Sequence, residues 1–267
     1  AVEKDMERLF TTLEEWGIPG VKIDFMDRSD QWMVGYYERV MKCAARHRLF
    51  VDMHGSYTPK GLYRTYPNLL TYEGVLGMEQ GARCKPENSN WLPFIRNAVG
   101  PMDFTPGSMF SAQPEDNRST GANPMGTGTR AYQMALYVVF ESPLQMLADN
   151  PVLYRREHPC TEFLAAVPTT WDSLRVLHAA CGREVVVARR KGDKWYVGGI
   201  TNDRPYTTEI ALDFLPAGRT FTMTSFEDGV NADLQATDYR KRVREVDAST
   251  VVKVEMVRNG GWAAVIE

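Results

Sequence analysis

Short apolar runs that each end in a polar or ionisable residue recur through the first 150 residues of the chain. They occupy residues 21–25, 49–54, 69–73, 101–105 and 143–147. Helical patterns or long loops separate them, including an apolar helical face over 3–16, a helix over about 31–47 and an amphipathic run over 130–141. Strands that alternate with helices favour a parallel sheet. The pattern therefore predicts an α/β fold in which about five strands belong to a (β/α)8 TIM barrel.

After about residue 165 the sequence pattern changes to alternating apolar and polar residues. Residues 183–202 alternate, turn at Lys191-Gly192-Asp193 and alternate again, which is typical of an antiparallel hairpin. Three further alternating runs follow at 208–215, 220–228 and 249–257. We expect a partial catalytic barrel over residues 1–165 and a small antiparallel, β-sandwich-like domain over 166–267. Since a closed barrel needs eight strands, the remaining strands are expected to come from the rest of a longer protein.

Composition narrows the function classes. The net charge of -3 supplies no basic field for nucleic acid or for an anionic membrane surface, and no apolar run approaches the roughly 20 residues of a membrane helix. The cysteines lack the spacing of a zinc site and the density of a disulfide scaffold, so we expect four free thiols: Cys43, Cys84, Cys160 and Cys181.

Candidate site residues lie where the first two strands end. Lys22 and Asp24 are expected to share one strand face, where the lysine would favour the ionised carboxylate of a nucleophile; the alternative is an internal ion pair. His54 ends the second strand, with Asp52 on the same face, and is a candidate for binding a substrate hydroxyl. A histidine with a purely structural role is the alternative.

Carboxylates also follow the later strands. Glu73 and Glu79 frame a loop with Gly74 and Gly77, and such a pair suits either acid/base catalysis or calcium binding, unless both are merely solvated. Asp103 ends the fourth run and is either a substrate contact or part of a structural ion pair. The β-rich domain is expected to be a structural cap, with carbohydrate binding through Trp171, Trp195 or Trp262 as a minor alternative.

Long phrases over residues 1–165, among them GVKIDFMDRSDQ, FVDMHGSYTPKGLYRTYPNLLTYEGVLGMEQ, VGPMDFTPG and SPLQMLADNP, closely resemble glycoside hydrolase family 97. The resemblance implies bacterial α-glucosidase or α-galactosidase activity, a C-terminal β domain, and an N-terminal β-sandwich and early barrel strands elsewhere in the protein. It implies that Asp24 is the nucleophile and Glu79 the general acid/base. It also implies a calcium ion near the acid/base, with Glu73 and Glu79 among its ligands.

The resemblance further separates two mechanistic branches. Inverting members carry a glutamate base directly after the histidine, where this chain has Gly55. We therefore expect a retaining exo-acting α-glycosidase, with α-galactosidase first, acting on an oligosaccharide substrate. The alternatives are an inverting α-glucosidase of the same family and a non-catalytic carbohydrate-binding fragment. A periplasmic or secreted bacterial enzyme is implied as well.

Overall fold

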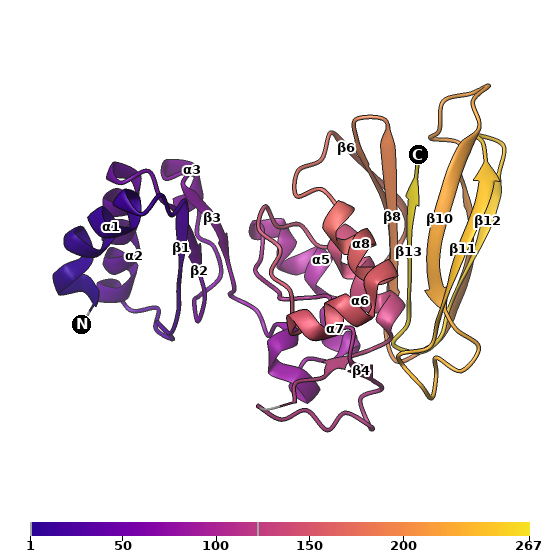
Figure 1. Cartoon of the computed structure of the whole chain (residues 1–267), viewed down its shortest axis with the longest axis horizontal. Coiled ribbons are helices and arrows are strands. Elements are labelled where there is room, and N and C mark those ends of the chain that lie inside the picture. The colour runs from indigo at the N-terminus through magenta and orange to yellow at the C-terminus, as the bar shows by residue number, and fades with distance from the viewer. Residues whose placement is uncertain (1, 122) are drawn as a thin grey trace.

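The computed structural model describes residues 2–121 and 123–267, and it begins with a small parallel sheet next to two helices (Figure 1). The sheet has the order β1 (Gly20–Ile23), β2 (Phe50–Met53), β3 (Leu69–Tyr72), with all strands parallel. A 3-10 turn (Val2–Asp5) leads into α1 (Met6–Glu15), and α2 (Gln31–Arg46) begins where the Asp30 carboxylate caps the Met33 amide. Both helices bury their apolar faces in one core with the sheet, as the spacing predicts.

The fourth and fifth predicted strands do not form as regular strands. Residues 101–105 contribute a single parallel bridge, between Tyr72 and Met102. Residues 143–147 are bends and irregular backbone. Pro101 and Pro106 bracket the first segment and Pro143 opens the second, and proline lacks the amide hydrogen that a strand ladder needs. Of the five runs expected to be strands, three therefore form the regular sheet and a fourth adds one bridge to it.

Short elements fill the middle of the chain. They are α3 (Leu62–Thr65), the 3-10 helix η2 (Met78–Arg83), α4 (Pro86–Ser89), α5 (Leu92–Ile95), η3 (Asn97–Val99), and the parallel pair β4 (Ser111–Ala112) and β5 (Gly126–Thr127). Two further helices, α7 (Pro151–Arg156) and α8 (His158–Ala166), precede the β-rich domain.

The C-terminal domain is antiparallel throughout, as predicted. A six-stranded sheet has the order β11 (Tyr239–Val246), β10 (Phe221–Asp228), β13 (Gly261–Ile266), β8 (Lys194–Thr201), β7 (Glu184–Lys191), β6 (Ser173–Ala180). The predicted hairpin is β7 and β8, closed by the Lys191–Lys194 pair. A second layer pairs β9 (Tyr206–Ala211) with β12 (Val251–Met256), and the side chains between the layers form one apolar core.

Helix α6 (Arg130–Val139) joins the two parts of the molecule (Figure 1). The helix predicted for 130–141 forms, but every one of its residues is buried, so the solvent-exposed face expected of an amphipathic helix is absent from it. The helix packs on β8 and β13 with one side and on barrel residues such as Phe104 and Met102 with the other. Its polar side chains are buried as well: Arg130 donates to the Met109 carbonyl and Gln133 to the Thr127 carbonyl, so polarity in the sequence does not mark a solvent-facing side here.

The tryptophans and cysteines of the chain differ in their exposure. Trp195 and Trp262 are buried in the core of the β domain, which rules them out as exposed platforms for sugar rings. Trp171 is half-buried beneath the Arg189 guanidinium. All four cysteines are free, with Cys181 exposed and the others buried. Among the described residues, no helix is both long and apolar enough to cross a membrane.

Candidate active site

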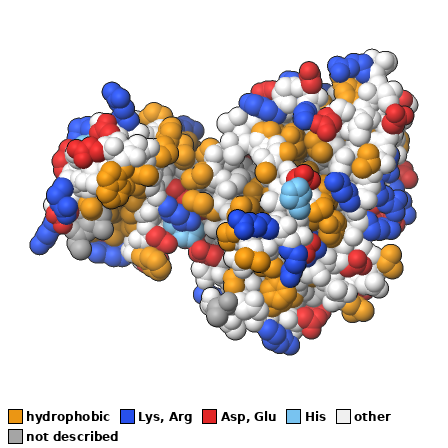
Figure 2. Space-filling view, viewed as in Figure 1, with side chains coloured by type: hydrophobic (Ala, Val, Ile, Leu, Met, Phe, Trp, Pro, Cys, Tyr) orange, Lys and Arg blue, Asp and Glu red, His pale blue; other side chains and the backbone are white. Residues whose placement is uncertain are grey.

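The ends of the parallel strands bring the predicted residues to one edge of the sheet. Asp24, His54 and Glu73 directly follow β1, β2 and β3. Asp103 follows the Met102 bridge, and its amide donates to the Tyr72 carbonyl at 2.8 Å. The carboxyl ends of parallel strands meet at one edge, so this clustering follows from topology alone. Figure 2 shows charged and histidine side chains gathered at the narrow waist between the two lobes.

His54 is the centre of the cluster and is only 3% exposed. Its Nδ1 lies 2.9 Å from Oδ2 of Asp103, and its Nε2 lies 2.8 Å from Oε1 of Glu79 and 3.3 Å from Oε1 of Glu73. Burial disfavours charge on the ring, but the hydrogen bonds to Asp103 and Glu79 outweigh it and raise the pKa of His54 to about 9. At neutral pH His54 is therefore an imidazolium that donates through both nitrogens.

Among the described residues Lys22 forms its ion pairs with Asp103 and Asp52, so the expected pairing of Lys22 with Asp24 is corrected. Its Nζ lies 2.6 Å from Oδ2 of Asp103 and 3.9 Å from Oδ2 of Asp52. Burial alone would lower the pKa of Lys22, yet the hydrogen bond and charge of Asp103 raise it. Strand β1 ends at Ile23, so the alternation that would align Asp24 with Lys22 stops one residue too early. The internal ion pair considered for Lys22 and for Asp103 is the one observed.

Asp24 lies against Gly55 instead. A Cβ atom at position 55 would be 2.7 Å from Oδ1 of Asp24 and 2.8 Å from the Phe25 backbone nitrogen. Gly55 has φ +56°, and the Asp27 amide donates to its carbonyl at 2.7 Å. Phe25 and Asp27 also have positive φ, +85° and +45°. The loop after β1 is thus strained backbone that holds the Asp24 carboxylate against a glycine without a side chain.

Glu79 and Glu73 are held in place rather than solvated at random. The Gly55 amide donates to Oε2 of Glu73 at 2.9 Å, and burial raises the pKa of that carboxyl. Glu79 lies in η2, where its amide donates to the Thr105 hydroxyl at 3.1 Å. The Glu73 side chain is 12% exposed and that of Glu79 is 40% exposed. Glu79 therefore reaches both His54 and the open side of the site.

Comparisons with known proteins identify the family. A family model described as glycoside hydrolase 97 matches residues 1–75, and one described as glycosyl-hydrolase 97 C-terminal, oligomerisation, matches residues 170–267. The chain belongs to glycoside hydrolase family 97. The resemblance predicted from the sequence phrases is thereby confirmed.

Relatives of this family 97 chain include a "Retaining alpha-galactosidase" of Bacteroides thetaiotaomicron, 42% identical over 100% of the chain and 41% of that protein. A "Probable retaining alpha-galactosidase" of Streptomyces bingchenggensis is 35% identical over 98% of the chain and 38% of that protein. A family 97 enzyme of Pseudoalteromonas sp. strain K8, solved with acarbose, has a TM-score of 0.88 and 33% identity, covering 100% of this chain and 44% of that one. The chain thus spans about two fifths of the curated relatives that it matches.

One residue that supports the candidate site carries no signal in the sequence. Arg96 is buried, and its guanidinium donates to the carbonyls of Tyr72 and Glu73 at 3.0 Å and of Gly100 at 2.9 Å. Burial lowers its pKa to about 10. It ties the end of β3 to the segment that carries Asp103. A single arginine in the largely apolar stretch 91–100 gives no hint of this role, because the carbonyls of Tyr72 and Glu73 belong to residues more than 20 positions away.

The site also offers a cation its preferred ligands. Ligand atoms of His54, Glu73 and Glu79 lie within 4.8 Å of one another. Calcium takes six to eight oxygen ligands, so the two glutamates fit such an ion, whereas His54 serves as their hydrogen-bond donor. Glu73 and Glu79 would supply part of the coordination, and the remaining oxygens must come from other groups.

Proposed function

We propose that the protein is a retaining α-galactosidase in which Asp24 and Glu79 are the catalytic pair. The observation that carries the proposal is that the two carboxylates flank one dipeptide: Asp24 touches Gly55, and Glu79 hydrogen-bonds to His54. Paired carboxylates on one sugar pocket are what glycoside hydrolysis requires. The curated relatives that are described as retaining α-galactosidases support the choice of substrate.

In the first step, an oxygen of Asp24 attacks the anomeric carbon while the leaving oxygen takes a proton from Glu79, giving a glycosyl ester on Asp24. In the second step, Glu79 removes a proton from water, which attacks the anomeric carbon and frees the Asp24 carboxylate. Oε1 of Glu79 already accepts from His54, so its Oε2 is the atom available to carry the transferred proton. The strained loop after β1 contributes by holding the Asp24 carboxylate in place before substrate arrives.

Gly55 supports the retaining branch on steric grounds. A glutamate base at this position would have to place its Cβ inside contact distance of the Asp24 carboxylate and the Phe25 backbone. Such a side chain and the observed position of Asp24 exclude each other. The inverting α-glucosidase alternative is therefore disfavoured for this chain.

Azide rescue of two alanine variants tests the two roles. With an activated α-galactoside, Asp24→Ala should give β-galactosyl azide, because azide replaces the missing nucleophile on the opposite face. Glu79→Ala should give α-galactosyl azide, because azide attacks the intact galactosyl ester. Glu87→Ala, which removes an exposed carboxylate of helix α4 outside the site, is the control and should stay active. Azide products of the same anomer from both variants, or β-galactose as the first product of the native enzyme, would contradict the assignment.

We also propose that calcium binds at Glu73 and Glu79. When bound, it would supply a positive charge that holds substrate hydroxyls beside the acid/base. In the chain itself, Glu73 and Glu79 both lie against the His54 imidazolium. Its positive charge reduces the repulsion between the two carboxylates in the absence of a cation. Titration calorimetry with calcium should show binding that Glu73→Gln weakens and Glu87→Gln, in the exposed helix α4, leaves unchanged.

The remaining barrel strands and the N-terminal β-sandwich are proposed to come from the rest of the full-length protein. Within the described residues the outer edge of β1 pairs with no further strand, and none of the four residues of β1 is fully buried, whereas a closed barrel leaves no strand edge unpaired. Activity of the full-length protein towards nitrophenyl α-galactoside that is absent from residues 1–267 alone would support this. A fully active isolated chain would contradict it.

A periplasmic or secreted location is proposed on the same family basis. Cell fractionation of the source bacterium, followed by immunoblotting for the protein, tests it. Recovery in the cytoplasmic fraction would contradict this location.

A further inference from the structure

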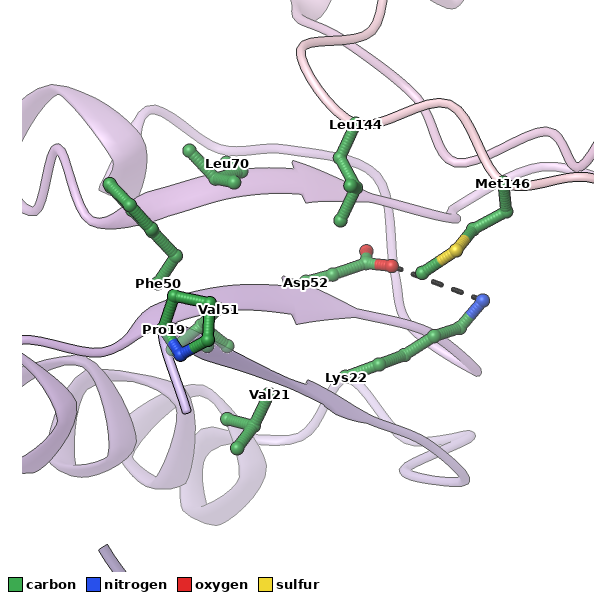
Figure 3. A pocket seen from close by; sticks show the side chains of 10 residues that line it. Pro19, Val21, Lys22, Phe50, Val51, Asp52, Leu70, Leu144 and Met146 are labelled. Carbon is green, nitrogen blue, oxygen red and sulfur yellow. Dashed lines mark ion pairs between the residues drawn. The ribbon is translucent and has the colours of Figure 1, made fainter. Parts of the chain in front are cut away.

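Asp52 is a buried carboxylate for which the mechanism above has no use. It lies in the middle strand of the parallel sheet, where it is in register with Lys22 on β1 and with Thr71 on β3. Its side chain is 1% exposed. Figure 3 shows that it points towards the Lys22 ammonium, with Met146 lying close to both. Burying a carboxyl group costs free energy, so its position two residues before His54 calls for an interaction that offsets that cost.

Hydrogen-bond accounting supplies the reason. Among the described residues neither oxygen of Asp52 has a hydrogen-bond donor, and the Oδ1 of Asp103 has none either. The Oδ2 of Asp103 is already used twice, by Lys22 at 2.6 Å and by His54 at 2.9 Å. An ionised buried carboxylate without a donor is strongly disfavoured. The Lys22 ammonium lies within 4 Å of both carboxyls, and the two carboxyls are themselves close enough to hydrogen-bond. A proton on Asp52 would remove the charge from its unpartnered oxygens and give the free Oδ1 of Asp103 a donor.

We propose that Asp52 is a neutral carboxylic acid that donates its proton to Oδ1 of Asp103, and that it thereby acts as a positioning residue for His54. The hydrogen bond leaves Asp103 ionised and fixes the direction in which its Oδ2 points. That oxygen orients the His54 ring, whose other nitrogen meets Glu79. Asp52 is thus connected to the proposed acid/base through two hydrogen-bonded neighbours.

The surrounding charges agree with this assignment. Burial raises the pKa of Asp52, and its contact with Asp103 raises it further; the charges of Lys22 and His54 oppose the shift but do not cancel it. The pKa of Asp103 moves the opposite way: burial would raise it, but the hydrogen bonds from His54, Asp52 and Lys22 together lower it. Two adjacent carboxyls with pKa values pushed apart are a shared-proton pair.

Two substitutions of similar size separate the hydrogen bond from the negative charge. Asp52→Asn keeps a donor for Oδ1 of Asp103 and cannot ionise, whereas Asp52→Leu removes the donor. In the full-length protein, infrared difference spectra at neutral pH between native and Asp52→Asn should show the loss of one protonated carboxyl band. Absence of that band difference would overturn the proposal. This readout requires neither substrate nor activity.

The kinetic test rests on the proposed α-galactosidase function. Asp52→Asn should keep kcat/KM within about threefold, and Asp52→Leu should lower it by about 10- to 100-fold, the usual effect of losing a supporting hydrogen bond around a site. The alkaline limb of the kcat/KM profile should move to higher pH in Asp52→Asn, because the group that ionises beside Asp103 is gone. Equal losses in both variants would show that the charge of Asp52 is needed, and would overturn the proposal. An inactive native protein with the band difference present would refute the function alone.

Discussion

Gly55 is the residue on which the geometry of the site depends most. Gly55→Ala should abolish most activity and destabilise the fold by more than about 1 kcal/mol, because the added Cβ collides with Asp24 and φ is positive. Gly192→Ala is a matched control, since Gly192 has φ +57° and nothing within 4 Å of its Cβ position. Urea unfolding and steady-state kinetics measure both effects. Equal behaviour of the two variants would mean that backbone strain, and not the Asp24 contact, matters at position 55.

The charge on His54 gives a second prediction at this scale. Its pKa of about 9 in the folded state exceeds the ordinary value of 6.5, so the protonated ring stabilises the folded state fully below pH 6.5. That contribution disappears as the pH rises through about 9. NMR titration of the ring should give a midpoint near 9 that falls towards the ordinary value in Asp103→Asn. A midpoint near 6.5 in the native protein would contradict the network.

Residue types at strand ends could be predicted from the sequence, but their partners could not. The alternation of apolar runs placed Asp24, His54, Glu73 and Asp103 at one edge, because topology alone brings strand ends together. The partner of Lys22 was predicted wrongly, since one residue decides where a strand stops and therefore which way Asp24 points. The role of Arg96 could not be predicted, because the side chain binds main-chain carbonyl groups, which every residue has and which therefore leave no pattern in the sequence.

At the scale of elements, α6 should be the most sensitive helix. Leu136 has no exposed surface, and replacing it with alanine should cost about 2–5 kcal/mol of unfolding free energy through lost burial and a cavity. Leu234→Ala is the control, because Leu234 is 75% exposed and its replacement should stay within about 0.5 kcal/mol. Chemical denaturation of both variants provides the comparison. A small effect at Leu136 would show that the helix is not a shared core element.

Elements with strong periodicity were the predictable ones. The helix over 31–47 and the hairpin at 184–201 form as expected, because each has a clear apolar face and a turn or cap. The segments at 101–105 and 143–147 resemble strands in composition but lack regular pairing. Their prolines remove ladder donors, and apolar composition alone does not say whether a partner strand is in reach.

At the scale of the whole molecule, Asp228 of β10 joins the two parts. Its carboxylate accepts from the Thr129 hydroxyl at 2.6 Å and from the amides of Val257 and Gly261 at 3.0 and 3.1 Å. Asp228→Ala should leave these buried donors without an acceptor, and each should lower the free energy of unfolding by roughly 1–3 kcal/mol. The melting temperature should fall accordingly, while Asp213→Ala, at an exposed position, should leave it unchanged. Unaltered melting of Asp228→Ala would contradict the idea of a tie between the parts.

The full burial of α6 also bears on how proteins of this kind can be rearranged. The face of the six-stranded sheet that points away from the second β layer is covered by a helix encoded within the preceding segment, so a gene fusion cut at the linker would leave that face of the transplanted sheet exposed. Such a module cannot be exchanged freely between hosts, and sequence changes in the sheet and in the helix are expected to arise together. The boundary near residue 166 is therefore not a point at which the gene can be divided without separating the sheet from the helix that covers it.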